Sequence, residues 1–80
     1  MKRVDYRRSA QRALRKLPQE VQTRVEAALE RYARTGEGNV KKLINVGGSR
    51  LRVGDYRAIF LETDKAVEVL AVGHRKDVYR

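Results

Sequence analysis

The sequence predicts an α+β fold in which a helical hairpin packs on one face of a small antiparallel sheet, with the element order β-α-α-β-β-β. The first observation behind this prediction is a helical repeat of apolar residues between residues 9 and 36. The second is a strand-like pattern, interrupted by turn residues, between residues 49 and 73. Helices and strands that are segregated along the chain are typical of the α+β class. The chain has 80 residues and no visible linker or repeat, so we expect one domain over residues 1–80.

The first helix is predicted in the segment SAQRALRKL, residues 9–17. Its apolar residues recur at i, i+3, i+4 and i+7, which places them on one helical stripe. They are Ala10, Ala13, Leu14 and Leu17. Ser9 has the side chain of an N-cap residue, so we expect the helix to begin there.

The second helix is predicted in the segment PQEVQTRVEAALERYARTG, residues 18–36. Pro18 suits a first helical turn because its missing N–H is not needed there. Gly36 is a typical helix stop. The short link between the two helices predicts an antiparallel hairpin with one apolar side. The second helix contributes Val21, Val25, Ala28, Leu29 and Tyr32 to that side.

Strands are predicted at residues 2–6, 49–53, 56–63 and 66–73. Gly54-Asp55 is a two-residue hairpin signal between the second and third of them. Residues 36–49 are expected to form a loop, with Gly47-Gly48 as its turn into the sheet. The two glycines lack the rest of a phosphate-binding loop pattern, so they are weak evidence for a phosphate cradle.

The Gly54-Asp55 hairpin fixes the faces of the sheet. With this turn, Val53 opposes Tyr56 and Arg52 opposes Arg57; opposed residues share a face, and alternate residues switch faces. One face collects apolar residues that must cover the helices: Leu51, Val53, Tyr56, Ala58 and Phe60. The other collects Arg50, Arg52 and Arg57, with Ile59 and Leu61 further along.

Two interpretations of this arginine-rich face stay open. Like charges directly opposed in a sheet cost up to ~1 kcal/mol, and no carboxylate of the hairpin lies beside Arg52 and Arg57 on that face. In the first interpretation the long side chains extend into water and the cost is small. In the second, the face is a site for phosphate, where guanidinium groups form bidentate contacts and an anion reverses the sign of the penalty.

The segment VGHRKDVYR, residues 72–80, follows the last predicted strand. Antiparallel order places this strand beside the preceding one, so its end delivers His74, Arg75 and Tyr79 to one rim of the sheet. A tail that folds over the arginine-rich face would add a guanidinium, an imidazole and a phenol that stacks on a base. The alternation of strand faces ends at Gly73, so the sequence leaves open which of the three points inward.

Composition narrows the partners. Nineteen Lys and Arg against ten Asp and Glu give a net charge of +9, spread over both halves of the chain. This charge favours an anionic partner, either nucleic acid or an acidic protein. There is no cysteine, no metal-ligand cluster and no apolar run of membrane-spanning length. We therefore expect a cytoplasmic protein without a metal, a cofactor or a membrane partner.

Three segments of the chain together resemble the RelE/ParE superfamily, the toxins of bacterial toxin–antitoxin pairs. They are SAQRALRKLPQEVQTRVEAALE, RLRVGDYRAIF and VLAVGHRKDVYR, and they cover nearly the whole chain. The resemblance is closest to the RelE branch. It implies a RelE-like fold and an mRNA endonuclease that acts on the ribosome and inhibits translation. It also implies a RelB-like antitoxin as partner, with a heterotetramer as one arrangement of the pair.

The resemblance also implies roles for single residues. Arg50 and Arg52 take positions of basic residues that hold the RNA backbone. Arg57 takes the position of an arginine on the scissile phosphate. Arg75 falls where an arginine stabilises charge or assists the leaving oxygen, and Tyr79 where a tyrosine stacks on the substrate base. The implied reaction is a metal-free transesterification, in which the RNA 2′-OH attacks the neighbouring phosphate.

The sequence departs from RelE at the position of the base. RelE has lysines where Arg50 and Arg52 stand, and an arginine with a pKa above about 12 is a poor proton acceptor. His74 is a candidate proton handler because an unperturbed imidazole has a pKa near 6.5. The alternative is that His74 only caps the end of the strand.

Two other functions remain alternatives at this stage. One is a ParE-like inhibitor that binds DNA gyrase without chemistry of its own. The other is an inactive module that binds its antitoxin or nucleic acid. In every case an acidic or amphipathic antitoxin segment is expected on the basic surface, with Ile59 and Leu61 as its apolar contacts.

Overall fold

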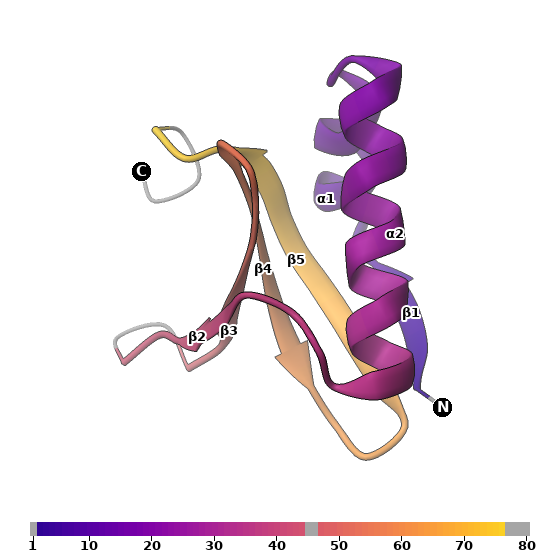
Figure 1. Ribbon diagram of the computed structural model, residues 1–80, viewed down its shortest axis with the longest axis vertical. Coiled ribbons are helices and arrows are strands. Elements are labelled where there is room, and N and C mark those ends of the chain that lie inside the picture. Colours follow the sequence, from indigo (N-terminus) through magenta and orange to yellow (C-terminus); the bar gives the residue numbers. More distant parts are fainter. Residues whose placement is uncertain (1, 45–46, 77–80) are drawn as a thin grey trace.

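The predicted order of helices and strands is confirmed, and one further short strand is present. The computed structural model describes residues 2–44 and 47–76. In chain order the elements are β1 (Arg3–Tyr6), α1 (Arg8–Arg15), α2 (Gln19–Thr35), β2 (Val40–Lys42), β3 (Ser49–Val53), β4 (Tyr56–Glu62) and β5 (Ala66–His74). The two helices form one layer and the sheet forms the other (Figure 1).

The sheet differs from the prediction in two respects. The described residues form a five-stranded sheet in the order β1-β5-β4-β3-β2. β1 runs parallel to β5, whereas the other neighbours are antiparallel, so the sheet is mixed. Local pattern could not give this pairing, because β1 and β5 lie at opposite ends of the chain. β2 falls in the segment expected to be a loop; its three residues are too few to show an alternating pattern.

The core lies between the helices and the face of the sheet that the hairpin register predicted. Leu51, Ala58 and Phe60 are buried there, and Val53 and Tyr56 pack against them. The helices contribute the buried side chains Ala10, Leu14, Val25, Leu29 and Ala33, and β5 contributes Val67, Val69 and Val72. Within the described ranges, neither helix is long and apolar enough to cross a membrane.

At α2 the C-terminal end follows the prediction, but the helix begins at Gln19, with Pro18 outside it as the N-cap. Gly36 ends α2 with φ 77°, and its N–H donates to the carbonyl oxygen of Tyr32 at 2.8 Å. The expectation that Ser9 caps α1 is wrong, since the helix begins at Arg8 and Arg7 occupies the cap position without a side-chain hydrogen bond. The physical reason is that the Arg7 N–H donates to the carbonyl oxygen of Val69 at 2.9 Å. Sheet pairing thus continues up to the first helical residue.

The Gly47-Gly48 turn leads into the sheet as predicted, because β3 begins at the next residue. Gly47 has φ 71°, a conformation that favours glycine. Gly48 is needed for a different reason. A Cβ at this position would lie 2.8 Å from the backbone oxygen of Phe60, so a side chain cannot fit unless β4 moves.

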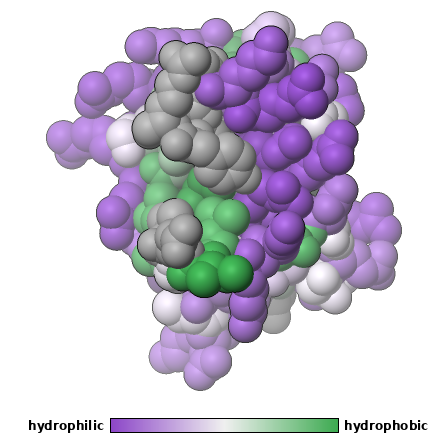
Figure 2. Space-filling model, turned by 90° about the vertical axis from the view of Figure 1, so that its left-hand side faces the viewer, coloured by the Kyte–Doolittle hydropathy of each residue, from purple (hydrophilic) through white to green (hydrophobic). Residues whose placement is uncertain are grey.

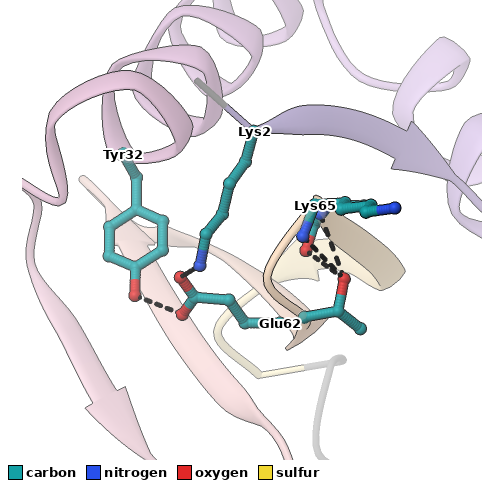
Figure 3. Close-up of polar contacts among 6 residues, drawn as sticks. Lys2, Tyr32, Glu62 and Lys65 are labelled. Atoms are coloured by element: carbon teal, nitrogen blue, oxygen red, sulfur yellow. Dashed lines mark hydrogen bonds and ion pairs between the residues drawn. The ribbon is translucent and has the colours of Figure 1, made fainter.

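The carboxylate of Glu62 joins three elements at one end of the sheet (Figure 3). It accepts a hydrogen bond from Nζ of Lys2, which precedes β1, and one of 2.7 Å from Oη of Tyr32 on α2. Hydrogen bonds from Lys2 and then Tyr32 hold the pKa of Glu62 below its usual range. The hydrogen bond to Glu62 and burial raise the pKa of Tyr32 to about 12.

Substitution Glu62→Gln is expected to cost about 1 kcal/mol of unfolding free energy at pH 7, a value discounted because the carboxylate is partly exposed. A depressed pKa stabilises the fold above the unfolded value of about 4.5, and this contribution is lost as the pH falls through the folded value. The difference between the two proteins should therefore shrink below pH 4.5. Urea unfolding between pH 3 and pH 7 measures it; a constant difference across this range would contradict the cluster's role.

Candidate nucleic-acid interface

Arg52 and Arg57 lie directly opposite each other across β3 and β4, as the hairpin register predicted. They therefore share the face of the sheet that points away from the helices. Arg50 lies on the same face, opposite Ile59. We call this surface, which carries Arg50, Arg52 and Arg57, the arginine face. Figure 2 views the molecule from this side.

Arg57 is a buried cation, only 8% exposed. Its Nη1 donates to the carbonyl oxygens of Gly54 and Tyr56, at 3.2 Å each. Its Nε is buried and has no hydrogen-bond partner in the described part of the chain. Among residues 2–44 and 47–76, no carboxylate forms an ion pair with it. Two carbonyl dipoles are thus the compensation that the described residues give to this charge.

This environment is unfavourable for a guanidinium without a ligand. Burying a charge costs several kcal/mol unless a counter-charge and hydrogen bonds offset the loss of hydration. An oxyanion at the arginine face would supply both for Arg57 and would reduce its repulsion with Arg52. Of the two interpretations of this face, the phosphate site accounts for the burial of Arg57. Extension into water does not account for Arg57, although it does describe Arg52, which is exposed.

The carbonyl oxygen of Gly54 accepts hydrogen bonds from two guanidinium groups at the β3–β4 turn. It accepts from Nη1 of Arg57 and also from Nε of Arg52, at 3.3 Å. Gly54 has φ 61°, and a Cβ there would lie 3.4 Å from Nη2 of Arg24 on α2. Arginines of two strands and one helix therefore meet at this turn. The approach of Arg24 could not be predicted from the sequence, because it depends on how α2 packs over the sheet.

Arg50 extends the basic surface toward the edge of the sheet. Its Nε is buried without a hydrogen-bond partner among the described residues, as in Arg57. Lys41 of β2 lies directly opposite Arg50 and so shares its face. Lys41 was not predicted as a site residue because the sequence did not reveal β2. The basic row across β2, β3 and β4 thus begins at Lys41.

Arg75 is held near the same turn by its backbone. Its N–H donates to the carbonyl oxygen of Asp55 at 2.8 Å, which ties the end of β5 to the β3–β4 turn. Arg75 is exposed. The structure therefore brings the backbone of Arg75 to the end of the sheet where Arg52 and Arg57 bind Gly54. Tyr79, the other tail residue singled out by the sequence, lies outside the described residues.

His74 is not brought to the arginine face. It lies opposite Tyr56 in the sheet and therefore on the helix side, while Gly73 lies opposite Arg57. The imidazole meets the Tyr56 ring edge-on, with ring centroids 5.6 Å apart. Its Nδ1 accepts a hydrogen bond of 3.2 Å from the N–H of Lys76. This geometry fits the alternative in which His74 fixes the end of the strand, and the strand parity explains why it points away from Arg57.

Apolar side chains accompany the arginines. Figure 2 shows an apolar strip flanked by hydrophilic side chains on this side of the molecule. The register places Ile59, Leu61 and Ala71 on the arginine face, as predicted for the first two. Ile44, which precedes the β3 strand, is 97% exposed. Such a mixture of apolar and basic groups suits an amphipathic protein segment as well as a nucleic acid.

The acidic residues of this face lie on β1 and β5, toward the opposite edge of the sheet from β2. Asp5 and Glu68 are opposite each other on β1 and β5. Asp5 pairs with Arg3 at 3.0 Å, and Glu68 pairs with Arg7 at 3.5 Å. Their charges are therefore matched locally and leave the basic row on β2, β3 and β4 uncompensated. Within the described ranges, no group of three or more metal-ligating side chains was found.

The fold and this face together define a small basic α+β domain with a candidate anion-binding face, and solved structures share its architecture. The RelE–RelB complex from Pyrococcus horikoshii contains a chain with 26% identity and a TM-score of 0.78, covering 96% of this chain and 98% of that one. The E. coli RelBE toxin–antitoxin complex contains a chain with 20% identity and a TM-score of 0.77, covering 92% of this chain and 96% of that one. The E. coli DinJ–YafQ complex contains a chain with 10% identity and a TM-score of 0.78, covering 99% of this chain and 98% of that one.

The sequence places the protein more closely. Residues 4–79 match the family described as the ParE toxin of the type II toxin–antitoxin system parDE. The chain therefore belongs to this family, within the RelE/ParE superfamily. A search of curated proteins found no match. The resemblance to RelE/ParE toxins predicted from the sequence is thus confirmed, and so is the RelE-like fold.

Proposed function

We propose that the protein is a toxin that cleaves mRNA on the ribosome and is neutralised by a cognate antitoxin. The observation that carries this proposal is the buried guanidinium of Arg57, which faces Arg52 and has no carboxylate partner among the described residues. A gyrase-binding surface has no need of such a group. Stabilising a phosphate whose negative charge grows in the transition state does require one.

The proposed reaction is a transesterification within the RNA. The 2′-oxygen forms a bond to the adjacent phosphorus while the bond from phosphorus to the 5′-oxygen breaks. The proton leaves the 2′-hydroxyl and a proton is delivered to the 5′-oxygen, which gives a 2′,3′-cyclic phosphate and a 5′-hydroxyl end. The arginines stabilise the charge of the pentacovalent phosphorus. The ribosome would hold the message in the geometry for in-line attack.

Each arginine has a place in this reaction. Arg57 contacts the scissile phosphate through its guanidinium, which forms no ion pair with a carboxylate among the described residues. Arg50 and Arg52 hold the neighbouring backbone phosphates. Arg75, near the β3–β4 turn, stabilises the leaving oxygen, and Tyr79 stacks on a base. His74 receives no catalytic role, because its ring lies on the helix side of the sheet.

The antitoxin is proposed to cover the arginine face. The strip formed by Ile59, Leu61 and Ala71 offers apolar contacts beside an excess of positive charge, which suits an acidic amphipathic segment. The similar chains from Pyrococcus horikoshii and E. coli were solved as toxin–antitoxin complexes. A RelB-like antitoxin bound there would block the same phosphates that the message occupies.

A direct test is brief expression in growing bacteria followed by mapping of new RNA 5′ ends. We expect cuts at fixed positions within codons of translated messages, each with a 5′-hydroxyl end. The control is Arg57→Gln, which should produce neither cuts nor growth arrest.

One observation favours a second function: the matching family is described by ParE, whose toxins are the alternative branch of the superfamily. In that case the protein would inhibit DNA gyrase by binding alone. Intact messages together with blocked supercoiling in the same cells would support the gyrase function and contradict the endonuclease.

A further inference from the structure

The outer face of α1 is a second basic surface, separate from the arginine face. The helices cover the opposite side of the sheet, so α1 lies on the other side of the molecule from Arg57 (Figure 1). The helix has no acidic residue, and it carries three arginines. They are Arg8, Arg12 and Arg15, and all are exposed. We call these three residues the α1 stripe.

The geometry of the helix turns the α1 stripe outward. At about 100° per residue the three arginines fall within an arc of about 60°. The buried residues Ala10 and Leu14 lie on the opposite side of the same helix. The stripe is about 10 Å long at 1.5 Å per residue. One strand of a nucleic-acid duplex presents about three phosphates over that length.

The stripe lacks local neutralisation. Among the described residues, none of its arginines forms an ion pair or a side-chain hydrogen bond, although Arg7 next to it pairs with Glu68. The longer helix α2 differs, because its exposed residues include both signs of charge. Three adjacent guanidinium groups without partners repel one another in water, and a row of phosphates removes this repulsion.

The remaining chemistry of this surface selects a nucleic-acid backbone. The other exposed residues of α1 are Ser9 and Gln11, so the surface offers neither an apolar contact to a protein segment nor an aromatic ring to a base. The apolar side of the helix is committed to the core, so it cannot insert into a lipid surface. What the surface offers is positive charge and guanidinium hydrogen bonds.

We propose that the α1 stripe binds the sugar–phosphate backbone of double-helical RNA, as a docking contact distinct from the cleavage site. If the protein acts on the ribosome as proposed above, the helical RNA of the ribosome is the partner, and the stripe holds the toxin while the arginine face reaches the message. The choice of RNA over DNA and the identity of the RNA rest on the proposed function; the binding of a duplex does not.

The test compares two variants of equal net charge. The triple variant R8Q/R12Q/R15Q removes the α1 stripe, and R31Q/R34Q/K65Q removes three exposed charges elsewhere; both change the net charge from +9 to +6. The probe is a 16-base-pair RNA duplex, and its affinity is measured by fluorescence anisotropy at several salt concentrations. We expect the stripe variant to bind at least about 10-fold more weakly than the control. For the stripe variant, the slope of log affinity against log salt concentration should be smaller in magnitude by two to three. The reason is that each phosphate contact contributes about 0.9 to this slope.

Equal duplex affinity of the two variants would overturn the inference. Loss of binding to polyglutamate in the stripe variant, with duplex binding unchanged, would assign the surface to an acidic protein and overturn it as well. Neither result decides whether the protein cleaves messages, because cleavage is read separately from RNA ends in cells. Conversely, an absence of message cuts would remove the endonuclease but leave the comparison of the two variants intact.

Discussion

Arg57→Gln is expected to reduce message cleavage by at least about 100-fold while making the protein more stable by about 1 kcal/mol. The two effects have one cause. Arg57 is 8% exposed, and carbonyl oxygens are its hydrogen-bond acceptors among the described residues. A shorter, neutral amide avoids the cost of the buried charge. The same change removes the charge that the phosphate needs.

A variant that is less active but more stable indicates that the arginine serves a ligand site. A variant that is less stable indicates that the arginine is a structural ion. Cleavage is measured on programmed ribosomes and stability by urea unfolding. The matched control is Arg34→Gln, an exposed arginine in the last turn of α2, which should change neither quantity. A loss of stability in Arg57→Gln would show that the guanidinium serves the fold, and the phosphate-site assignment would then lose its physical basis.

Phe60→Ala is expected to lower the unfolding free energy by about 3–5 kcal/mol, the largest effect on stability. Phe60 is fully buried in the centre of β4, and its ring lies 5.2 Å from that of Tyr32. A domain of this size has a stability of roughly 4–12 kcal/mol, so the substitution removes about a quarter of it or more. Urea unfolding followed by circular dichroism measures the change.

Ile44→Ala is the control for Phe60→Ala, because Ile44 is an aliphatic residue that is 97% exposed. Its effect on stability should stay within about 0.5 kcal/mol. A cost below 1 kcal/mol for Phe60→Ala would contradict the placement of β4 at the centre of the core.

The faces of the central hairpin could be predicted because local rules determine them. Gly54-Asp55 sets a two-residue turn, the turn sets the register, and the register places Arg52 opposite Arg57. The helical stripes gave the buried residues of α1 and α2 for a similar reason, since a period of 3.6 residues is read directly from the chain. These features need no knowledge of distant contacts.

Other features depend on contacts that local pattern does not encode. The parallel pairing of β1 with β5 and the approach of Arg24 to Gly54 join residues that are far apart in the chain. The register shift between Ile59 and Phe60 and the burial of Arg57 arise from the packed sheet. The position of His74 could not be predicted without knowing how β5 pairs with β4. That pairing places His74 opposite Tyr56 rather than on the arginine face.

The most direct measurement is a double-mutant cycle between Arg57 and the phosphate at the cut site. Single-turnover cleavage is compared for messages with an oxygen or a sulfur at one non-bridging position, using the parent protein, Arg57→Gln and Arg34→Gln on programmed ribosomes. We predict that sulfur slows the parent and Arg34→Gln, but has a much smaller effect on Arg57→Gln, because the contact it weakens is already missing. An identical slowing in all three proteins would mean that Arg57 does not touch the scissile phosphate.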